Sequence, residues 1–384
     1  MPRLVFAVFI LLSACTGSPS IVDDNMPKES TEPERVYVYD GEPLRIGIAG
    51  LTHTHVHWLL GRKDYGDVVI AGIAEPNREL AERYCEQHGL SKDLIYPSLE
   101  EMVTATEPEA VTAFNSTYEH LETVAFCAPR GIDVMVEKPL AVNIEHARKM
   151  AALAREHGIA LLTNYETSWY GSNATAHQII LKEKKIGPIR RMVFRTGHPG
   201  PIEIGCNQEF LAWLTDPVMN GGGVVMDFGC YGANLATWLL EGQRPIAISC
   251  QLQTLKPAKY PKVDDEANIL VTYPDGQVTI QASWNWSHNL KEMDVYGTVG
   301  YVRCKDRASM SIMTYVDEKP AIEPHIAPQP INAHVDPFAY FAAVTKQGYE
   351  DQAFSPSSLE NNLLVMEILE AAKLSAATGQ TVKL

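Results

Sequence analysis

The spacing of hydrophobic positions divides the chain into two successive patterns. In the first, short apolar runs rich in valine, isoleucine and alanine alternate with amphipathic segments of helical period. The apolar runs are residues 44–50, 68–75, 111–115, 133–136 and 159–164, and the amphipathic segments are residues 52–60, 77–88, 121–129 and 144–157. Short runs of this kind are typical of buried parallel strands. Their alternation with helices predicts a doubly wound α/β domain with a parallel sheet.

From about residue 166 the apolar runs become longer, with few helical segments between them. They are residues 190–196, 245–255, 267–273, 277–286 and 291–302. Pro274-Asp275-Gly276 lies between two of them and is a strong hairpin signal. The pattern predicts one large open antiparallel sheet, an α+β arrangement over residues 166–384, after the α/β domain of residues 44–165. Two helical segments, 338–345 and 359–378, are expected to pack back against the earlier layers.

Residues 1–43 do not show the pattern of a folded domain. Arg3 precedes an apolar segment, residues 4–12, that is too short to span a membrane. The Leu-Ser-Ala-Cys sequence ending at Cys15 resembles the cleavage motif of bacterial lipoproteins, so residues 1–15 are predicted to be a signal peptide with an acylated Cys15. An ordinary signal peptide that contains a cysteine is the alternative. Residues 16–43, rich in Ser, Pro, Asp and Glu, are predicted to be a disordered tether, and the protein to be a membrane-anchored lipoprotein facing the periplasm.

Composition narrows the classes of partner. Hydrophobic residues make up 46% of the chain and charged residues 21%, as in a folded soluble protein. The formal net charge of −15 argues against nucleic acid and anionic lipid surfaces as partners, because both would repel the chain. Six cysteines besides Cys15 are spaced too widely for a disulfide-dense scaffold or a CxxC metal site. We therefore expect a small or neutral ligand and cysteines that are mostly small buried apolar residues.

The turn after the first apolar run is the test for nucleotide binding. The usual fingerprint is GxGxxG, and its positions fall on Gly50, Thr52 and His55, so only the first glycine is present. A helix opening at Thr52, with that residue as its N-cap, would still offer free N–H groups to a phosphate. Glu75, at the end of the second run, is placed to bind a ribose diol. A carboxylate there favours NAD over NADP, because it would repel a 2′-phosphate.

The same turn admits a second interpretation. His53 and His55 form an HxH pair at the end of a strand, and such pairs supply two ligands in some metal-dependent hydrolases. Residues two apart do not share a face of a helix, so they could converge only if the segment were extended. Metal binding, and contact of one or two of these histidines with a cofactor or substrate, both stay open on the sequence.

Glu137-Lys138-Pro139 follows the fourth apolar run directly. Pro139 has a fixed φ and no N–H, so it ends the strand and restricts Lys138 to an extended or turn geometry. The carboxyl edge of the sheet is where open α/β folds bind their ligands. A surface turn with a solvated Lys–Glu pair is the alternative.

A second informative stretch spans residues 220–234. Three glycines precede Asp227, Tyr231 and Asn234, whose spacing of four and three residues would place them on one helical face. A polar face on an otherwise apolar helix needs partners or a ligand if it is buried. In the alternative interpretation, Asp227 caps the helix and Tyr231 packs in the core.

With both motifs, residues 44–384 resemble the Gfo/Idh/MocA family of NAD(P)-dependent oxidoreductases, which pair a Rossmann domain with a large open antiparallel sheet and act mostly on sugars, polyols and their derivatives. The family's EKP lysine falls on Lys138. Its DxGxH segment falls on Asp227, Gly229 and Tyr231, with a tyrosine where histidine is usual. Thr52 and His55 depart from the family's glycine loop.

The resemblance implies hydride transfer between a sugar-like carbinol and nicotinamide. Tyr231 would be the acid/base, with Lys138 favouring its phenolate and polarising the substrate oxygen, and Asp227 would orient the pair. The implied cofactor contacts are Gly50, Thr52, His53, His55, Glu75, Asn115, His120, Glu137 and Lys138. Candidates for the sugar pocket are Trp169, Tyr170, His198 and Asn234.

Export would limit how such an enzyme uses its cofactor, because free NAD is scarce outside the cytoplasm. We therefore expect a tightly held NAD that is regenerated within one cycle, as in redox-assisted cleavage or epimerisation of glycosides. Two other functions are a sugar-binding lipoprotein that has lost catalysis and a metal-dependent hydrolase that uses His53 and His55. Association of copies through the open sheet is expected by analogy with the family.

Overall fold

The computed structural model describes residues 39, 41–350 and 352–384. The predicted signal peptide with Cys15, and most of the predicted tether, lie outside the described residues. Among the helices that are described, none is long and apolar enough to cross a membrane.

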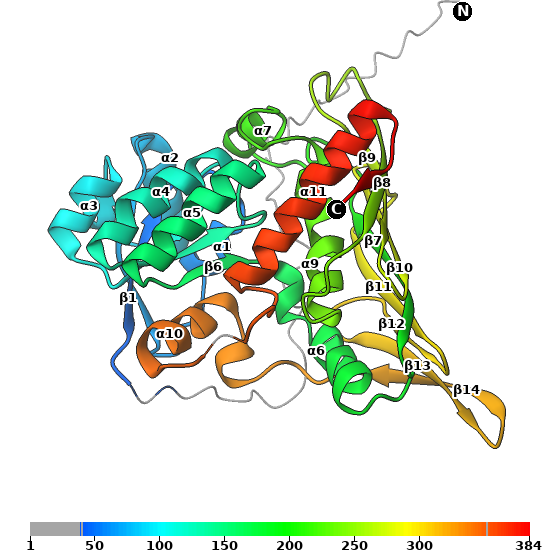
Figure 1. The fold of residues 1–384 in the computed structure, drawn as a ribbon. Coiled ribbons are helices and arrows are strands. Elements are labelled where there is room, and N and C mark those ends of the chain that lie inside the picture. Colours follow the sequence, from blue (N-terminus) through cyan, green and yellow to red (C-terminus); the bar gives the residue numbers. More distant parts are fainter. Residues whose placement is uncertain (1–38, 40, 351) are drawn as a thin grey trace, which may run out of the picture. The chain divides into compact units, whose positions relative to one another are not determined.

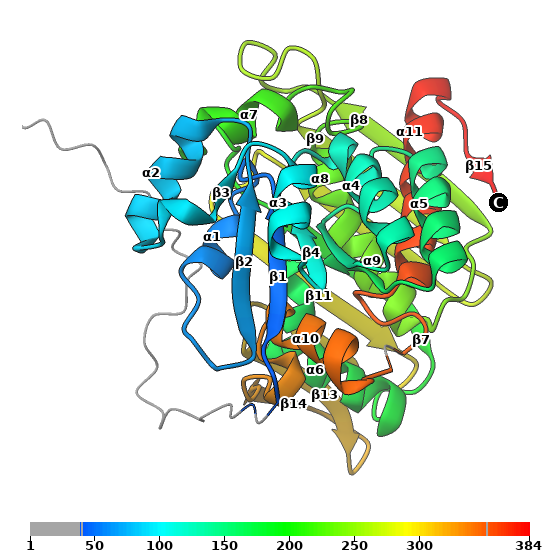
Figure 2. The ribbon, with the colours of Figure 1, turned by 90° about the vertical axis from the view of Figure 1, so that its left-hand side faces the viewer.

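The first sheet is parallel throughout and has six strands. They are β1 (Leu44–Ala49), β2 (Val68–Ala74), β3 (Ile95–Tyr96), β4 (Ala110–Ala113), β5 (Asp133–Glu137) and β6 (Leu161–Asn164). Their order is β3-β2-β1-β4-β5-β6, and Figure 2 shows β2 and β1 side by side in blue. The order reverses between β1 and β4, and in such sheets the crevice at the carboxyl ends of these two strands binds ligands. The predicted doubly wound parallel sheet is confirmed.

Helices cover both faces of this sheet. They are α1 (Val56–Leu60), α2 (Arg78–His88), α3 (Leu99–Thr106), α4 (His120–Cys127) and α5 (Ile144–His157), joined late in the chain by α10 (Pro337–Gln347). Helices α3 and α4 contact the strands on one face, and α10 contacts β1 and β2. The short 3₁₀ turns of the described chain are Lys92–Leu94, Thr117–Glu119, Ala128–Arg130, Glu166–Trp169 and Asn332–His334, and Gln178–Lys182 is a π-helical turn.

The first turn differs from the prediction. Helix α1 begins at Val56 rather than at Thr52, and its N-cap, His55, makes no capping bond through its side chain. The physical reason is that the backbone of the turn bonds to neighbouring strands: the His53 N–H donates to the Phe114 carbonyl at the end of β4, over 2.8 Å. Residues 51–55 therefore form an irregular turn. Their side chains do not point in the directions that a helix would impose.

The second sheet has nine strands. They are β7 (Ile189–Gly197), β8 (Ala247–Gln253), β9 (Glu266–Thr272), β10 (Gln277–Ser283), β11 (Leu290–Gly297), β12 (Tyr301–Cys304), β13 (Ser309–Val316), β14 (Lys319–Ile326) and β15 (Val382–Lys383). Their order is β14-β13-β12-β11-β7-β10-β9-β8-β15. The large open sheet with a β9–β10 hairpin is confirmed.

Two details of that prediction were wrong. The sheet is mixed, because β10 pairs in parallel with β7. The long connection between these strands, which includes three helices, allows the chain to cross over and run in the same direction again. The run 291–302 is two strands, β11 and β12, which pair antiparallel. Strands β13 and β14 were not predicted.

Helices lie on one face of this sheet, which we call the inner face. They include α6 (Gly171–His177), α7 (Gln208–Leu214), α8 (Val224–Asp227), α9 (Gly229–Leu239) and α11 (Leu359–Thr378). Helix α9 contacts β7 and β10, and α11 contacts β8, α9 and α5. Figure 1 shows these helices on one side of the strands and none on the other side, which we call the outer face.

The glycine run before α8 allows a close approach of three segments. A Cβ on Gly223 would lie 2.0 Å from the Asp264 carbonyl oxygen, and one on Gly221, which has φ +79°, would lie 2.2 Å from the Val142 carbonyl oxygen. The Asp264 carboxylate accepts the N–H groups of Gly223 and Val225 and so caps α8. Since α8 ends at Asp227 and α9 begins two residues later, the predicted single polar helical face is interrupted.

Cys85, Cys127, Cys230, Cys250 and Cys304 are buried free thiols, and Cys206 is half-buried. The five buried thiols are small apolar residues of the core, as predicted from their spacing.

Candidate active site

Lys138 and Asp227 form a buried ion pair where the two domains meet. Lys138 Nζ donates to Asp227 Oδ1 over 2.5 Å and to the Asp227 carbonyl oxygen over 3.1 Å. The other carboxylate oxygen accepts the Trp284 indole N–H. Burial disfavours both charges, but their mutual attraction raises the pKa of Lys138 and lowers the pKa of Asp227. Lys138 is therefore charged at neutral pH, with one of its three N–H donors left over.

Tyr231 lies beside this pair. Its ring centroid is 5.2 Å from Lys138 Nζ and 5.7 Å from the ring of Phe228. Its side chain is buried, and its hydroxyl makes no hydrogen bond among the described residues. Burial, reinforced by the negative charge of Glu166, raises the pKa of Tyr231 well above its usual value.

The prediction that Lys138 lowers the pKa of Tyr231 was therefore wrong. The reason is that Asp227 neutralises the ammonium group, so its charge does not outweigh the effect of burial. Tyr231 is a neutral phenol, which suits a proton donor.

His198 follows β7 and packs its ring edge on Phe228, with 4.9 Å between centroids. Its Nδ1 accepts the Gly200 N–H over 2.9 Å, so the neutral ring carries its proton on Nε2. Burial lowers the pKa of His198 to about 4, and the ring is neutral at physiological pH. His198 thus presents an N–H donor to the same region as Lys138, and its contact with a substrate stays a prediction.

Sequence reasoning missed a second charged cluster near Tyr231. The buried Glu166 accepts Lys291 Nζ over 2.6 Å on one oxygen, and accepts Arg307 over 3.0 Å and the Tyr170 hydroxyl over 2.6 Å on the other. Lys291 Nζ lies 5.5 Å from the Tyr231 ring centroid. Glu166 and Lys291 are 125 residues apart in sequence, so no local motif indicates the pair.

Glu137 organises the edge of the parallel sheet. One carboxylate oxygen accepts the Asn164 amide over 2.7 Å, and the other lies 2.9 Å from His55 Nδ1. Burial opposes ionisation, but the electrostatic effect of the neighbouring imidazoles of His55 and His53 and these hydrogen bonds outweigh it and lower the pKa of Glu137 to about 2.

Three of the predicted sugar-pocket residues face inward. The Trp169 indole N–H donates to Asn164 behind Glu137, and the Tyr170 hydroxyl is bound to Glu166. Asn234 is fully buried, and its amide donates to the Pro356 carbonyl at the start of the segment leading into α11. The prediction for Asn234 was wrong, because it joins α9 to α11 rather than lining a site.

His53, His55 and Glu137 place three ligand-capable atoms within 4.8 Å of one another. The irregular turn allows this convergence, which a helix from Thr52 would have prevented. His53 Nδ1, however, accepts the His55 N–H over 3.1 Å, so the neutral ring carries its proton on Nε2, the atom that faces Glu137 at 3.9 Å. A protonated imidazole nitrogen cannot bind a metal ion. The arrangement favours orientation of the Glu137 carboxylate over metal binding.

The crevice between β1 and β4 carries free polar groups that fit a dinucleotide. The N–H groups of Thr52 and Thr54 donate to no other group of the described chain. Asn115 Oδ1 and His120 Nε2 are buried acceptors without partners. Burial lowers the pKa of His120 to about 4, and its Nδ1 lies 3.1 Å from the Leu140 carbonyl oxygen, so Nε2 is a bare acceptor.

Gly50 and Glu75 shape that crevice. Gly50 has φ +77°, and a Cβ there would lie 2.6 Å from Asn115 Cβ, so only glycine fits. The buried Glu75 carboxylate accepts the N–H groups of Leu51 and Asn77 over 2.9 and 2.8 Å and braces the turn. Its contact with a ribose stays a prediction.

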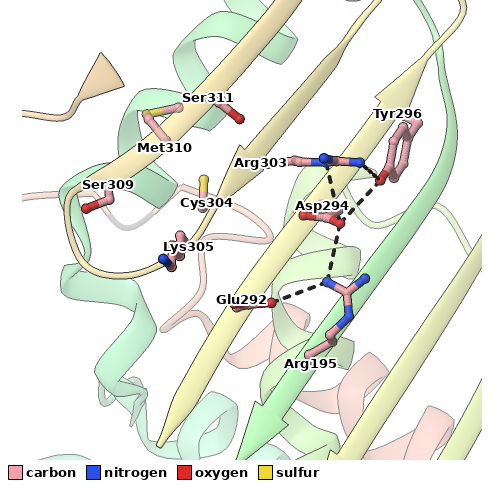
Figure 3. A pocket seen from close by; sticks show the side chains of 10 residues that line it. All are labelled: Arg195, Glu292, Asp294, Tyr296, Arg303, Cys304, Lys305, Ser309, Met310 and Ser311. Carbon is pink, nitrogen blue, oxygen red and sulfur yellow. Dashed lines mark hydrogen bonds and ion pairs between the residues drawn. The ribbon is translucent and has the colours of Figure 1, made fainter. Parts of the chain in front are cut away.

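A separate hollow of about 440 Å³ opens on the outer face. Figure 3 shows Arg195 reaching Glu292 and Asp294, each over 3.3 Å, and Arg303 reaching Tyr296 over 2.9 Å. Asp294 also accepts the Tyr296 hydroxyl over 3.2 Å. These charged groups satisfy one another, and none of them contacts Lys138 or Tyr231.

Two models of one protein family match the chain. Residues 44–165 match the oxidoreductase family with an NAD-binding Rossmann fold, and residues 174–303 match the Gfo/Idh/MocA C-terminal domain. The chain belongs to the Gfo/Idh/MocA family. Its first domain is thus an NAD-binding Rossmann domain, in agreement with the free polar groups between β1 and β4 and with the predicted resemblance.

Curated members of the Gfo/Idh/MocA family are similar in sequence. A 1,5-anhydro-D-fructose reductase of Ensifer adhaerens is 28% identical over 211 residues, which are 53% of this chain and 59% of that protein. A trans-1,2-dihydrobenzene-1,2-diol dehydrogenase of Bos taurus is 27% identical over 237 residues, 61% of this chain and 65% of that protein. The chain spans about three fifths of the length of these curated relatives.

Solved structures of Gfo/Idh/MocA-like fold cover more of the chain. An inositol dehydrogenase homolog complexed with NAD+ from Azotobacter vinelandii has a TM-score of 0.76 at 18% identity and covers 90% of this chain and 98% of its own. An aldose-aldose oxidoreductase from Caulobacter crescentus, complexed with glycerol, has a TM-score of 0.70 at 22% identity and covers 89% of this chain and 100% of its own. These likenesses concern the fold.

Proposed function

We propose that the protein is an NAD-dependent oxidoreductase that interconverts a hydroxyl and a carbonyl group on a sugar, glycoside or polyol. The observation that carries the proposal is the buried Lys138–Asp227 pair beside the unbonded hydroxyl of Tyr231. A charged donor and a neutral phenol at one point provide the two groups that such a reaction needs at the substrate oxygen. The relatives named above support the substrate class.

Lys138, Tyr231 and His198 have different roles in this proposal. Lys138 Nζ keeps one N–H donor for the substrate oxygen and stabilises the negative charge that develops there. Tyr231 Oη transfers the proton to or from that oxygen. His198 Nε2 donates to a neighbouring oxygen and orients the substrate. Bound NAD supplies the hydride acceptor or, when reduced, the hydride donor.

The protonation state of Tyr231 favours one direction at neutral pH. Because the pKa of Tyr231 is raised, its hydroxyl keeps the proton and donates it to a developing alkoxide. Carbonyl reduction thus starts from the resting state of the site. Oxidation of a hydroxyl needs the phenolate, and its rate should rise with pH.

Three finer proposals rest on the sequence. A lipid anchor at Cys15 would place the enzyme outside the cytoplasm. Retention of one cofactor through a complete cycle, with oxidation of a sugar carbon followed by cleavage or epimerisation and re-reduction, suits that location. Association of copies would use the outer face of the sheet, which no helix of the described chain covers. Mass analysis of the membrane-bound protein, reaction products and sedimentation, respectively, test these proposals.

The test of the main proposal is release of the cofactor. The purified full chain, gently denatured, is expected to release a nicotinamide dinucleotide, or to bind added NAD when isolated empty. A chain that binds sugars but neither retains nor binds the dinucleotide would be a sugar-binding protein, and the proposal would be wrong. Elemental analysis of the same sample tests the metal-dependent alternative directly.

A further inference from the structure

Tyr231 lies near two lysines, and the proposed function uses only one of them. Lys291 projects from β11 onto the inner face, and its side chain is 12% exposed. Its Nζ lies 5.5 Å from the ring centroid of Tyr231 and 5.8 Å from that of Phe228. Lys138 Nζ lies at similar distances from the same two rings, 5.2 and 5.6 Å.

Lys291 forms an ion pair with Glu166, whose negative charge also raises the pKa of Tyr231. Glu166 is 3% exposed and binds Lys291 at 2.6 Å and Arg307 at 3.0 Å. Charges in such a buried setting interact more strongly than in water, because no solvent screens them. Removal of the charge of either Glu166 or Lys291 should therefore change the pKa of the Tyr231 phenol.

Several ionisable groups lie around Tyr231. They are Lys138 and Glu137 from the end of β5, Tyr165 and Glu166 after β6, Asp227 from α8, Cys230 from α9 and Lys291 from β11. Lys138 pairs with Asp227, and Glu137 with His55. Burial raises the pKa of Tyr165 and of Cys230, so both are neutral. Glu166 and Lys291 remain as the pair whose charges can be changed without altering the proposed catalytic groups.

We propose that Glu166 and Lys291 are positioning residues that set how tightly Tyr231 holds its proton. Glu166 stabilises the neutral phenol, and Lys291 stabilises the phenolate. Neither needs to touch the substrate, since both act through Tyr231. The inference rests on the proposed function only in making Tyr231 the acid/base of the reaction.

The proposal predicts shifts of opposite sign. Glu166→Gln keeps the shape of the side chain and removes its negative charge, so the pKa of Tyr231 should fall. Lys291→Gln removes one of the two positive charges that bind Glu166 and leaves that of Arg307, so the pKa of Tyr231 should rise. Charges at this range shift a pKa by about one unit or more. In the double variant Glu166→Gln/Lys291→Gln the pKa of Tyr231 should be close to its wild-type value. Lys291→Arg keeps the positive charge, so it should leave this pKa unchanged.

The titration can be followed without substrate. The full chain is labelled with fluorotyrosine, whose phenol is more acidic than that of tyrosine, and the ¹⁹F signal of residue 231 is assigned by its loss in Tyr231→Phe. The expected order of titration midpoints is Glu166→Gln, then wild type, then Lys291→Gln. The matched control is Lys149→Gln, because Lys149 pairs with Glu145 on the exposed face of α5 and should leave the midpoint unchanged.

Midpoints that move in the same direction in both variants, or not at all, would overturn the proposal. If Glu166→Gln does not fold, Arg307→Gln gives a second measurement at the exposed end of the cluster, with a smaller shift in the direction of Lys291→Gln. Failure of the proposed function is a separate result, since full turnover by Tyr231→Phe would remove Tyr231 from the chemistry whatever its titration midpoint.

Discussion

Strand β11 carries charged side chains to both faces of the large sheet, and the two faces use them differently. Lys291 points inward to Glu166, which is 4% exposed as a side chain. Its neighbour Glu292 points outward to Arg195, whose side chain is 33% exposed. Similar ion pairs therefore lie on either side of one strand. One lies beside Tyr231, and the other, which Figure 3 shows, lies on the partly exposed outer face.

The difference shows that burial, rather than the number of ion pairs, gives a charge cluster its effect. Exposed pairs are screened by water and salt and contribute little to stability. Buried pairs interact strongly with every nearby group, and they hold the protonation states of Lys138, Asp227 and Tyr231.

Loss of the Lys138 charge should have the largest effect. Lys138→Met removes the donor to the substrate oxygen and leaves Asp227 buried without its partner. We expect turnover to fall about 10³-fold and the free energy of unfolding to fall by about 3 kcal/mol. Kinetics and chemical denaturation measure the two effects.

The double variant Lys138→Met/Asp227→Asn separates these two effects. It removes both charges, so it should recover most of the lost stability while turnover stays low. Recovery of turnover together with stability would mean that Lys138 acts only on folding.

The second largest effect is expected for the stability of the protein at acid pH, to which Glu137 contributes. Its pKa is lowered to about 2, so its contribution to stability is complete above its unfolded pKa and is lost as the pH falls toward 2. Over that range wild type should lose about 3 kcal/mol more than Glu137→Gln, since each pKa unit corresponds to about 1.4 kcal/mol. Denaturation curves at pH 6, 4 and 2 measure the difference. Glu292→Gln on the outer face is the matched control and should follow wild type.

The smallest effect is expected on the outer face. Arg195→Gln breaks its contacts with Glu292 and Asp294, yet the stability change should stay within about 1 kcal/mol, because the side chains of Arg195 and Glu292 are 33% and 27% exposed. The pH profile of turnover should not move. A shift as large as that of Lys291→Gln would show that burial does not separate the two faces.

Periodicity predicted the first domain well because its short apolar runs alternate regularly with amphipathic segments. The five buried strands β1, β2, β4, β5 and β6 and the helix α5 lie within a residue or two of the predicted ranges. The parallel pairing of β7 with β10 could not be predicted, since it depends on a crossover far away in sequence. Strand β14 lies at the edge of the sheet with Ile322 and Ile326 facing solvent, so its apolar positions do not mark a buried face.

The candidate site was predicted only where its residues belong to a motif. Lys138 and Asp227 belong to two motifs and lie together as expected, but their direct contact shows why Tyr231 is neutral. Helix α1 starts late because the backbone of the turn bonds to β4, a tertiary contact that no local signal reports. Glu166 and Lys291 were missed for the same reason, since neither lies in a motif.

Hydride transfer in a single turnover would show directly whether Tyr231 acts as the acid/base of the reaction. The purified chain, loaded with reduced nicotinamide cofactor, is mixed with keto sugars and their reduced partners, and the nicotinamide absorbance is followed in wild type and in Tyr231→Phe. The account predicts oxidation of the cofactor by at least one keto sugar in wild type, about 10²- to 10⁴-fold slower in Tyr231→Phe. An equal rate in the two proteins would contradict it.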